Sequence, residues 1–168
     1  MSIHFYDSAS PQNIPSGVHA QVYINGYAWP DSEIKRMGAV YRTSVLQEAH
    51  WAQWASEIDV ENGAATPADA LAFVKFRRLH YDDAKVYVNR SNWLTVAELF
   101  RGCDEKQPHY RVATLDGTVD VTLDLDGEKI EPWAVQYYGG ENAPYDLSVL
   151  KGVYDFHKPG VMGGPYGT

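Results

Sequence analysis

The sequence predicts an α/β fold: an irregular, TIM-like (β/α) barrel with parallel strands and helices in its first two thirds and a helix-poor, antiparallel closing section. Two observations predict it. Short apolar strand segments recur at fairly even intervals with helix-start signals between several of them. The last third instead alternates apolar and polar residues around a turn signal. A chain of 168 residues fits one domain, which we expect over residues 1–158, followed by a Gly/Pro-rich tail at 159–168.

The elements follow from local patterns. We expect strands, in order, at residues 3–6, 20–25, 39–42, 56–60, 85–89 and 110–115. Thr66 to Asp69 and Thr95 to Glu98 each read as a capping box that starts a helix, and Asp31-Ser32 can start a shorter helix that ends at Gly38. Asp126-Gly127 predicts a hairpin turn, after which residues 129–138 are expected to return antiparallel to residues 119–125.

Composition excludes several function classes. The net charge of −8 argues against nucleic acid as a partner, because affinity for phosphates comes mainly from cationic side chains. No apolar run approaches the roughly 20 residues that span a bilayer, and the N-terminus lacks the pattern of a signal peptide. The histidines show no metal-ligand spacing and Cys103 is the only cysteine, so we expect no metal, no cofactor and no intrachain disulfide.

The stretch SEIDVENG, residues 56–63, carries the clearest chemical signal. Asp59 and Glu61 are two positions apart on an expected strand and so share one face, about 6.5–7 Å apart at the backbone, while Ile58 and Val60 face apolar packing. Two carboxylates this close raise the pKa of at least one of them, which suits acid catalysis. We expect Glu61 to be the less solvated of the two. An isolated Asp-x-Glu is more often a solvated strand face.

Further acids follow other expected strands or the Tyr-rich segment WAVQYYGG. They are Asp7, Asp116 and Asp146. In a parallel α/β barrel the loops at the carboxyl ends of the strands meet at one face, so these acids can converge on a single cleft with Asp59 and Glu61.

The segments FYDSASPQ, EIDVEN, KVYVNRSNW and WAVQYYGGENAPYDLSVL, in this order, resemble the glycoside hydrolase family 25 lysozymes. The resemblance implies a barrel of five strand-helix units followed by strands without helices. It also implies that Glu61 protonates the glycosidic oxygen and that Asp59 stabilises the positively charged sugar or an intermediate formed by its N-acetyl group. Asp7 and Asp146 match auxiliary acids of the cleft. The residues expected to bind substrate are Tyr27, Trp29, Asn89, Asp116, Trp133, Gln136 and Tyr138.

The sequence also departs from that family. Tyr110 and Asp116 lie where a Trp-x-Ala-x-Tyr strand is expected, and the segment AVYRTSV lacks an aromatic-His-Phe element. The chain is also shorter than is usual for the family, which indicates trimmed walls around the cleft.

Two functions are compatible with these patterns. The first is a lysozyme-like glycoside hydrolase that cleaves the glycan strands of peptidoglycan. The alternative is a catalytically silent barrel used as a phage virion structural module or as a glycan-binding module. The resemblance implies a phage-encoded protein, located in the virion or in the host cytoplasm before lysis and acting at the bacterial cell wall. We expect the C-terminal tail to contact a protein partner or a second copy of the chain.

Overall fold

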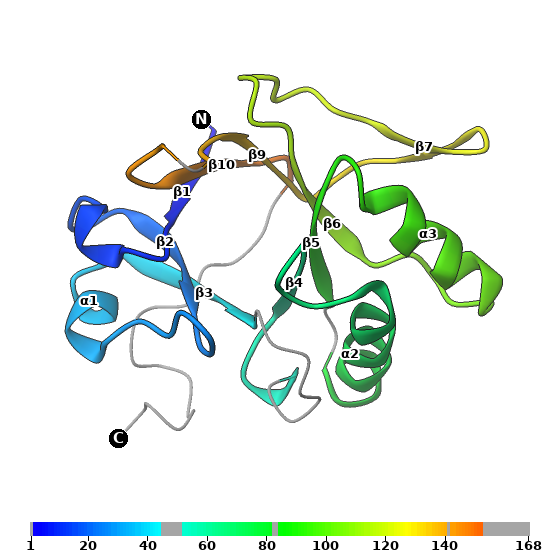
Figure 1. Ribbon diagram of the computed structural model, residues 1–168, viewed down its shortest axis with the longest axis horizontal. Helices are drawn as coiled ribbons and strands as arrows, with labels where there is room; N and C mark the ends of the chain where they lie inside the picture. The colour runs from blue at the N-terminus through cyan, green and yellow to red at the C-terminus, as the bar shows by residue number, and fades with distance from the viewer. Residues whose placement is uncertain (1, 45–51, 82–83, 141, 153–168) are drawn as a thin grey trace.

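The computed structural model describes residues 2–44, 52–81, 84–140 and 142–152. In these residues eight strands form one closed barrel in the order β1-β10-β9-β6-β5-β4-β3-β2 (Figure 1). The barrel strands are β1 His4–Asp7, β2 His19–Tyr23, β3 Ala39–Ser44, β4 Glu57–Val60, β5 Lys85–Asn89, β6 His109–Ala113, β9 Ala134–Tyr138 and β10 Asp146–Leu150. The predicted irregular α/β barrel is confirmed.

The directions of the strands determine which of their ends lie together at one end of the barrel. Neighbouring strands from β1 through β6 are parallel, and β9 is parallel to β6. Only β10 is antiparallel to its neighbours in the barrel, β9 and β1, and it pairs Asp146 with Asp7. The beginning of β10 therefore lies at the same end of the barrel as the carboxyl ends of the other strands.

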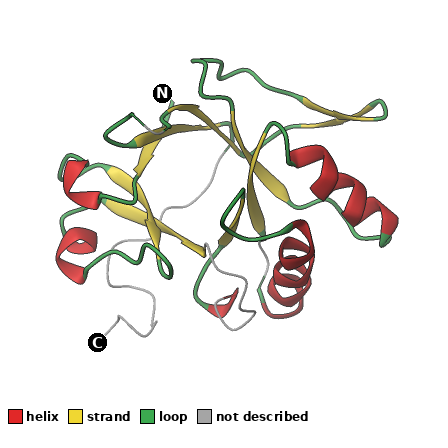
Figure 2. Cartoon of the chain, in the orientation of Figure 1, coloured by secondary structure: helices red, strands yellow, loops and turns green. Residues whose placement is uncertain are grey.

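The helices pack outside the barrel (Figure 2). They are α1 Asp31–Lys35, α2 Pro67–His80 and α3 Trp93–Gly102, with a short 3-10 helix η1 at Pro11–Asn13. Ile58 and Val60 of β4 belong to the main apolar cluster together with Phe73 and Val74 of α2. The outer faces of the strands thus supply the core, as expected for Ile58 and Val60, and the alternate side chains are left to the interior of the barrel.

Of the two capping boxes predicted from the sequence, one is confirmed and one is wrong. Thr66 and Asp69 form the predicted capping box of α2, with the Thr66 amide 2.8 Å from Asp69 Oδ2. The second predicted box is wrong, because α3 begins at Trp93 and Thr95 lies inside it. The side chain of Asn89 accepts a hydrogen bond of 2.9 Å from the Asn92 amide, and this turn starts the helix earlier.

The last third of the chain differs from the prediction in one strand pairing. Leu123–Leu125 (β7) and Glu128–Ile130 (β8) form the predicted antiparallel hairpin around Asp126-Gly127, where both residues have positive φ. The expected return along residues 129–138 is wrong beyond Ile130, since β9 instead joins the barrel beside β6. Within the described residues, no helix is long and apolar enough to cross a membrane. The predicted tail, residues 159–168, lies outside the described residues.

Candidate active site

A polar cavity of about 380 Å³ lies at the end of the barrel where the parallel strands terminate. Its walls come from the ends of β1, β2, β4, β5 and β9, from the start of β10 and from the loops beside them. The lining residues are Asp7, Tyr23, Asp59, Glu61, Asn62, Tyr87, Asn89, Leu115, Gln136, Gly140 and Asp146. The structure therefore brings together the four carboxyl groups expected to be catalytic, Asp7, Asp59, Glu61 and Asp146.

Asp59 and Glu61 face the cavity from β4 and the residue just beyond its end. Asp59 is only 3% exposed, whereas Glu61 is exposed, so the expectation that Glu61 would be the less solvated is wrong. The reason is position: Asp59 lies within the strand and Glu61 lies past its last residue, at the mouth. Asp59 Oδ1 is buried and accepts no hydrogen bond from the described residues.

Burial raises the pKa of both Asp59 and Glu61, and repulsion from Glu61 raises that of Asp59 further. Desolvation and then the charge of Glu61 raise the pKa of Asp59 well above its usual value. The cavity wall also desolvates Glu61 enough to raise its pKa, while the cation of Arg111 opposes that rise. The charge of one carboxyl therefore makes it harder for the other to ionise.

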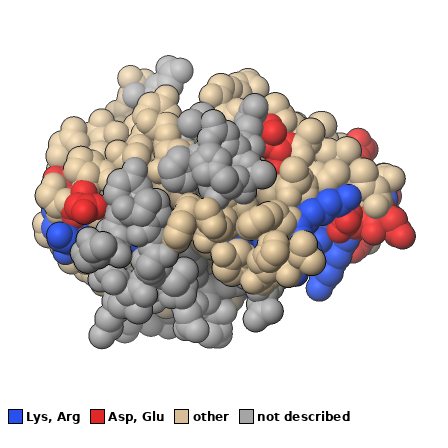
Figure 3. All heavy atoms as spheres, turned by 90° about the horizontal axis from the view of Figure 1, so that it is seen from below, with Lys and Arg blue, Asp and Glu red and all other residues tan. Residues whose placement is uncertain are grey.

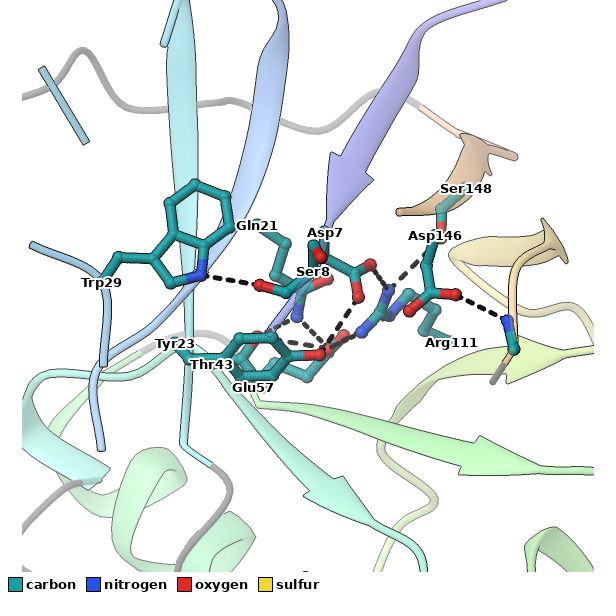
Figure 4. Close-up of polar contacts among 11 residues, drawn as sticks. Asp7, Ser8, Gln21, Tyr23, Trp29, Thr43, Glu57, Arg111, Asp146 and Ser148 are labelled. Carbon is teal, nitrogen blue, oxygen red and sulfur yellow. Dashed lines mark hydrogen bonds and ion pairs between the residues drawn. The ribbon is translucent and has the colours of Figure 1, made fainter. Parts of the chain in front are cut away.

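Asp7 is held as a hydrogen-bond acceptor at the end of β1 (Figure 4). Its Oδ2 lies 2.8 Å from Arg111 Nη1, and its Oδ1 accepts a 3.1 Å hydrogen bond from the Tyr23 hydroxyl. Both Asp7 and Arg111 are almost fully buried. Charge-assisted bonds of this kind hold the carboxylate in one orientation.

Asp146 lies at the start of β10, where it is paired with Asp7 of β1. Burial first, and then the nearby charge of Asp7, raise the pKa of Asp146 to about 7. The Gly140 amide donates a 3.0 Å hydrogen bond to Asp146 Oδ1. A Cβ on Gly139, whose φ is +144°, would lie 1.7 Å from the same oxygen, so only glycine leaves room for this carboxyl.

A second polar layer lies beneath the cavity. Arg111 Nε is 3.1 Å from Glu57 Oε1, which also accepts hydrogen bonds from the Gln21 amide and the Thr43 hydroxyl. Arg111 Nη1 also contacts Ser148 Oγ at 3.3 Å. These side chains come from five different strands and are at most 1% exposed, so the interior of the barrel is a buried hydrogen-bonded network (Figure 4).

The residues expected to bind substrate separate into two groups. Asn89 and Gln136 line the cavity. The other five do not line it: Tyr27, Trp29, Asp116, Trp133 and Tyr138. Tyr27 and Tyr138 are exposed, at 63% and 46%, and Asp116 is in an exposed ion pair with Arg90 at 3.1 Å.

The two expected tryptophans pack in the core. Trp29 is 4% exposed and donates its indole N–H to the Ser8 carbonyl oxygen at 2.9 Å. Trp133 is 2% exposed and stacks on Phe5, with ring centroids 5.7 Å apart. The placement of both as sugar-binding residues is therefore wrong, because their ring faces are covered by protein.

Several residues of the candidate site and of the polar layer beneath it were not expected from the sequence. They are Gln21, Tyr23, Thr43, Glu57, Tyr87, Arg111 and Ser148. A signal was present: Gln21 lies between Ala20 and Val22, and Arg111 between Tyr110 and Val112, so single polar residues interrupt apolar strand segments. Among the described residues, no group of three or more His, Cys, Asp or Glu is arranged to hold a metal ion.

Comparisons with known proteins find a similarity of structure but none of sequence. No protein-family model matches the chain, and no curated protein matches it. The fold is similar to the structure of a family GH25 lysozyme from Aspergillus fumigatus, with a TM-score of 0.48 and 11% sequence identity. The similarity covers 91% of this chain and 95% of that one. GH25 is the family that the sequence motifs resemble.

Proposed function

We propose that this protein is a lysozyme-like glycoside hydrolase that cleaves the glycan strands of peptidoglycan by carboxylate acid catalysis. The observation that carries the proposal is the Asp59–Glu61 pair, which lines a cavity that also holds Asp7 and Asp146. A cavity of about 380 Å³ is within the range of small-molecule sites and suits part of a glycan chain.

The role of each carboxyl group in the proposed reaction depends on whether it is protonated or ionised. Cleavage of a glycosidic bond needs one carboxyl that donates a proton to the leaving oxygen and one carboxylate that stabilises the positive charge developing on the sugar. Two neighbouring carboxyls with raised pKa values, one of which keeps its proton when the other has ionised, provide both. Arg111 and the Tyr23 hydroxyl hold Asp7 as an acceptor, which leaves it available to orient a sugar hydroxyl or an attacking water. Gln136 and Asn89 add amide groups that can hydrogen-bond to the sugar.

The setting belongs to the same proposal. A peptidoglycan-cleaving protein acts at the bacterial cell wall, and the family resemblance supports a phage-encoded enzyme present in a virion or in the host cytoplasm before lysis. The net charge of −8 supports a partner other than nucleic acid. We further propose that the C-terminal tail contacts a protein partner or a second copy of the chain.

One observation favours the alternative, a silent barrel that serves as a virion structural or glycan-binding module. Trp29 and Trp133, the two tryptophans expected on the substrate side, are buried in the core, so the cavity has fewer aromatic faces on which a sugar can stack. The clearing assay below separates the two functions.

The decisive experiment compares wild type with Glu61→Gln. General acid catalysis contributes on the order of 10²–10⁴ in rate, so the variant should clear suspensions of purified cell walls slower by about that factor. Its stability should be unchanged or slightly higher, because a like charge beside Asp59 is removed. Turbidity and thermal unfolding measure the two effects.

The matched control is Glu98→Gln, the same chemical change at an exposed position on α3. It should clear cell walls like the wild type. If the wild type clears no peptidoglycan tested, or if Glu61→Gln clears as fast as Glu98→Gln, hydrolysis by this carboxyl pair is excluded and the binding or structural function takes its place.

A further inference from the structure

Leu115 is an aliphatic side chain in a cavity that is otherwise polar. The described residues that line the cavity carry carboxyl, amide and phenol groups, and among them no other side chain is aliphatic. Leu115 is 47% exposed, so its side chain is not packed into the core. A single exposed leucine is common on protein surfaces, but the backbone at this position is not.

The backbone at Leu115 has a conformation that leucine rarely adopts, with a φ of +57°. Among the described residues, the other non-glycine positions with positive φ are Asp104 and Asp126. A short polar side chain tolerates this conformation more easily, because it can hydrogen-bond locally to the backbone. Strained residues of this kind persist where the surrounding structure enforces them, and they cluster at ligand-binding sites.

Hydrogen bonds on one side and an ion pair on the other hold this turn in place. The carbonyl oxygen of Gln136 on β9 accepts hydrogen bonds from the amides of Thr114 at 2.8 Å and Leu115 at 3.3 Å. Asp116 forms its ion pair with Arg90, just beyond the end of β5. The turn after β6 is therefore fixed to both neighbouring strands, and the barrel sets the position of the leucine.

Two amide side chains flank the end of β6, where this turn begins. Ala113, the last residue of β6, is paired with Asn89 of β5 and with Gln136 of β9, and both of these residues line the cavity. Asn89 Oδ1 accepts hydrogen bonds from the Ser91 hydroxyl at 2.7 Å and from the Asn92 amide at 2.9 Å. The N–H groups of the Asn89 side chain are therefore the part that is available to a ligand.

We propose that Leu115 is a specificity-determining residue that selects sugars carrying an acetamido group: it packs against the methyl of the acetyl group while Asn89 donates an N–H to the acetyl oxygen. This rests on the proposed function, since it assigns one substituent of the glycan to one wall of the same cavity. An acetamido group joins an apolar methyl to a hydrogen-bonding amide, and this wall offers a match for each. A sugar with a hydroxyl in its place gains nothing from the leucine.

The test is Leu115→Asn, which keeps the approximate size of the side chain and removes its apolar character. Calorimetry measures the binding of tetra-N-acetylchitotetraose, whose sugars carry acetamido groups, and of cellotetraose, whose sugars carry hydroxyls instead. The parent and every variant also carry Glu61→Gln, so that no sugar is cleaved. The parent should bind the acetylated sugar more tightly. In the variant the Kd for that sugar should rise about tenfold, the low end of what one methyl group contributes in an apolar pocket, while binding of cellotetraose stays unchanged.

Stability shows that the variant is intact. Leu115→Asn should melt at the same temperature as the parent or higher, because asparagine adopts a positive φ more readily than leucine. If it does not fold, Leu115→Gly replaces it, since glycine is unstrained at this φ and also removes the apolar contact. The matched control is Leu94→Asn on α3, which is 43% exposed and does not line the cavity. It should bind both sugars like the parent.

The proposal is overturned if the parent binds the acetylated sugar no more tightly than cellotetraose. It is also overturned if the folded Leu115 variant loses no more affinity than Leu94→Asn. The cell-wall assay separates this result from the proposed function. If the wild type clears nothing but Leu115→Asn weakens binding of the acetylated sugar as expected, hydrolysis fails and the role of Leu115 stands. If cell walls are cleared while that Kd stays fixed, hydrolysis stands and the role of Leu115 is overturned.

Discussion

Arg111 is the residue on which the interior of the barrel depends. It is 1% exposed and contacts two buried carboxylates from opposite sides, Asp7 on β1 and Glu57 on β4. The interaction with its acidic neighbours outweighs the cost of burial and raises the pKa of Arg111 above its ordinary value. A charge of this kind is retained because removing it leaves its partners buried without compensation.

Arg111→Met should therefore lower the free energy of unfolding by about 3–5 kcal/mol, the range seen when one partner of a buried ion pair is removed. The matched control is Arg101→Met, at an exposed ion pair with Asp126 in which the Arg101 side chain is 47% exposed. That change should cost less than about 1 kcal/mol. Urea denaturation measures both, and equal losses would contradict the importance assigned to Arg111.

At the scale of residues, the sequence indicated the acids but not their cation. Asp59 and Glu61 stood out because two acids alternate at the end of a β-branched segment. Arg111 and Gln21 are single polar residues in short strands, and alternation alone does not tell a side chain that faces solvent from one that faces the inside of a barrel. That distinction requires knowing that the sheet closes, which depends on contacts distant in the sequence.

The elements themselves were predictable where the signal is local. The residues of β5 were predicted to the residue, and α2 begins at its capping box. β9 was misassigned because its partner, β6, is decided by the register of Arg111 with Ala134, more than twenty positions away in the chain. A turn such as Asp126-Gly127 fixes which strands form a hairpin but not how far their pairing extends.

The two Thr-x-x-acid motifs provide a test at this scale. Thr66→Ala should cost about 0.5–2 kcal/mol of stability, because it removes the acceptor for the Asp69 amide at the start of α2. Thr95→Ala should change stability by less than about 0.5 kcal/mol, because Thr95 is an exposed residue inside α3. Chemical denaturation of the two variants measures their free energies of unfolding. A similar loss in both would mean that α3 starts later than described.

The whole molecule combines a surface of paired charges with an acidic interior. In Figure 3, acidic and basic side chains lie close together at the left and at the right of the face that is seen. Several surface charges are paired, including Lys75 with Glu105 at 3.3 Å and Lys151 with Asp120 at 2.6 Å. The acids of the cavity, in contrast, have Arg111 as the cation they share.

This distribution predicts how stability depends on pH. Folding raises the pKa of Glu57, Asp59 and Glu61, and that of Asp146 to about 7. Between about pH 4, where unfolded carboxyls titrate, and pH 7, the folded chain holds more protons than the unfolded chain, so stability falls as pH rises.

We therefore expect the melting temperature to be highest in mild acid and to fall toward neutral pH. Asp146→Asn should make this slope shallower and raise the melting temperature at pH 7, since a neutral side chain then replaces one that is costly to ionise. The matched control is Asp126→Asn, the same chemical change in an exposed hairpin turn that does not line the cavity. A melting temperature that rises steadily from pH 4 to pH 7 would contradict the buried position of these acids.

The antiparallel strand β10 also has a consequence for how the barrel can be connected. Because β10 pairs with β1 in opposite direction, His4 lies beside Val149, and the Leu150 amide donates a 2.9 Å hydrogen bond to the Ile3 carbonyl oxygen. This junction is at the end of the barrel opposite the cavity. In a chain shortened to end at residue 152, a short linker from there to residue 2, with new termini opened in another loop, would give a circularly permuted barrel, and the linker would leave the mouth of the cavity open.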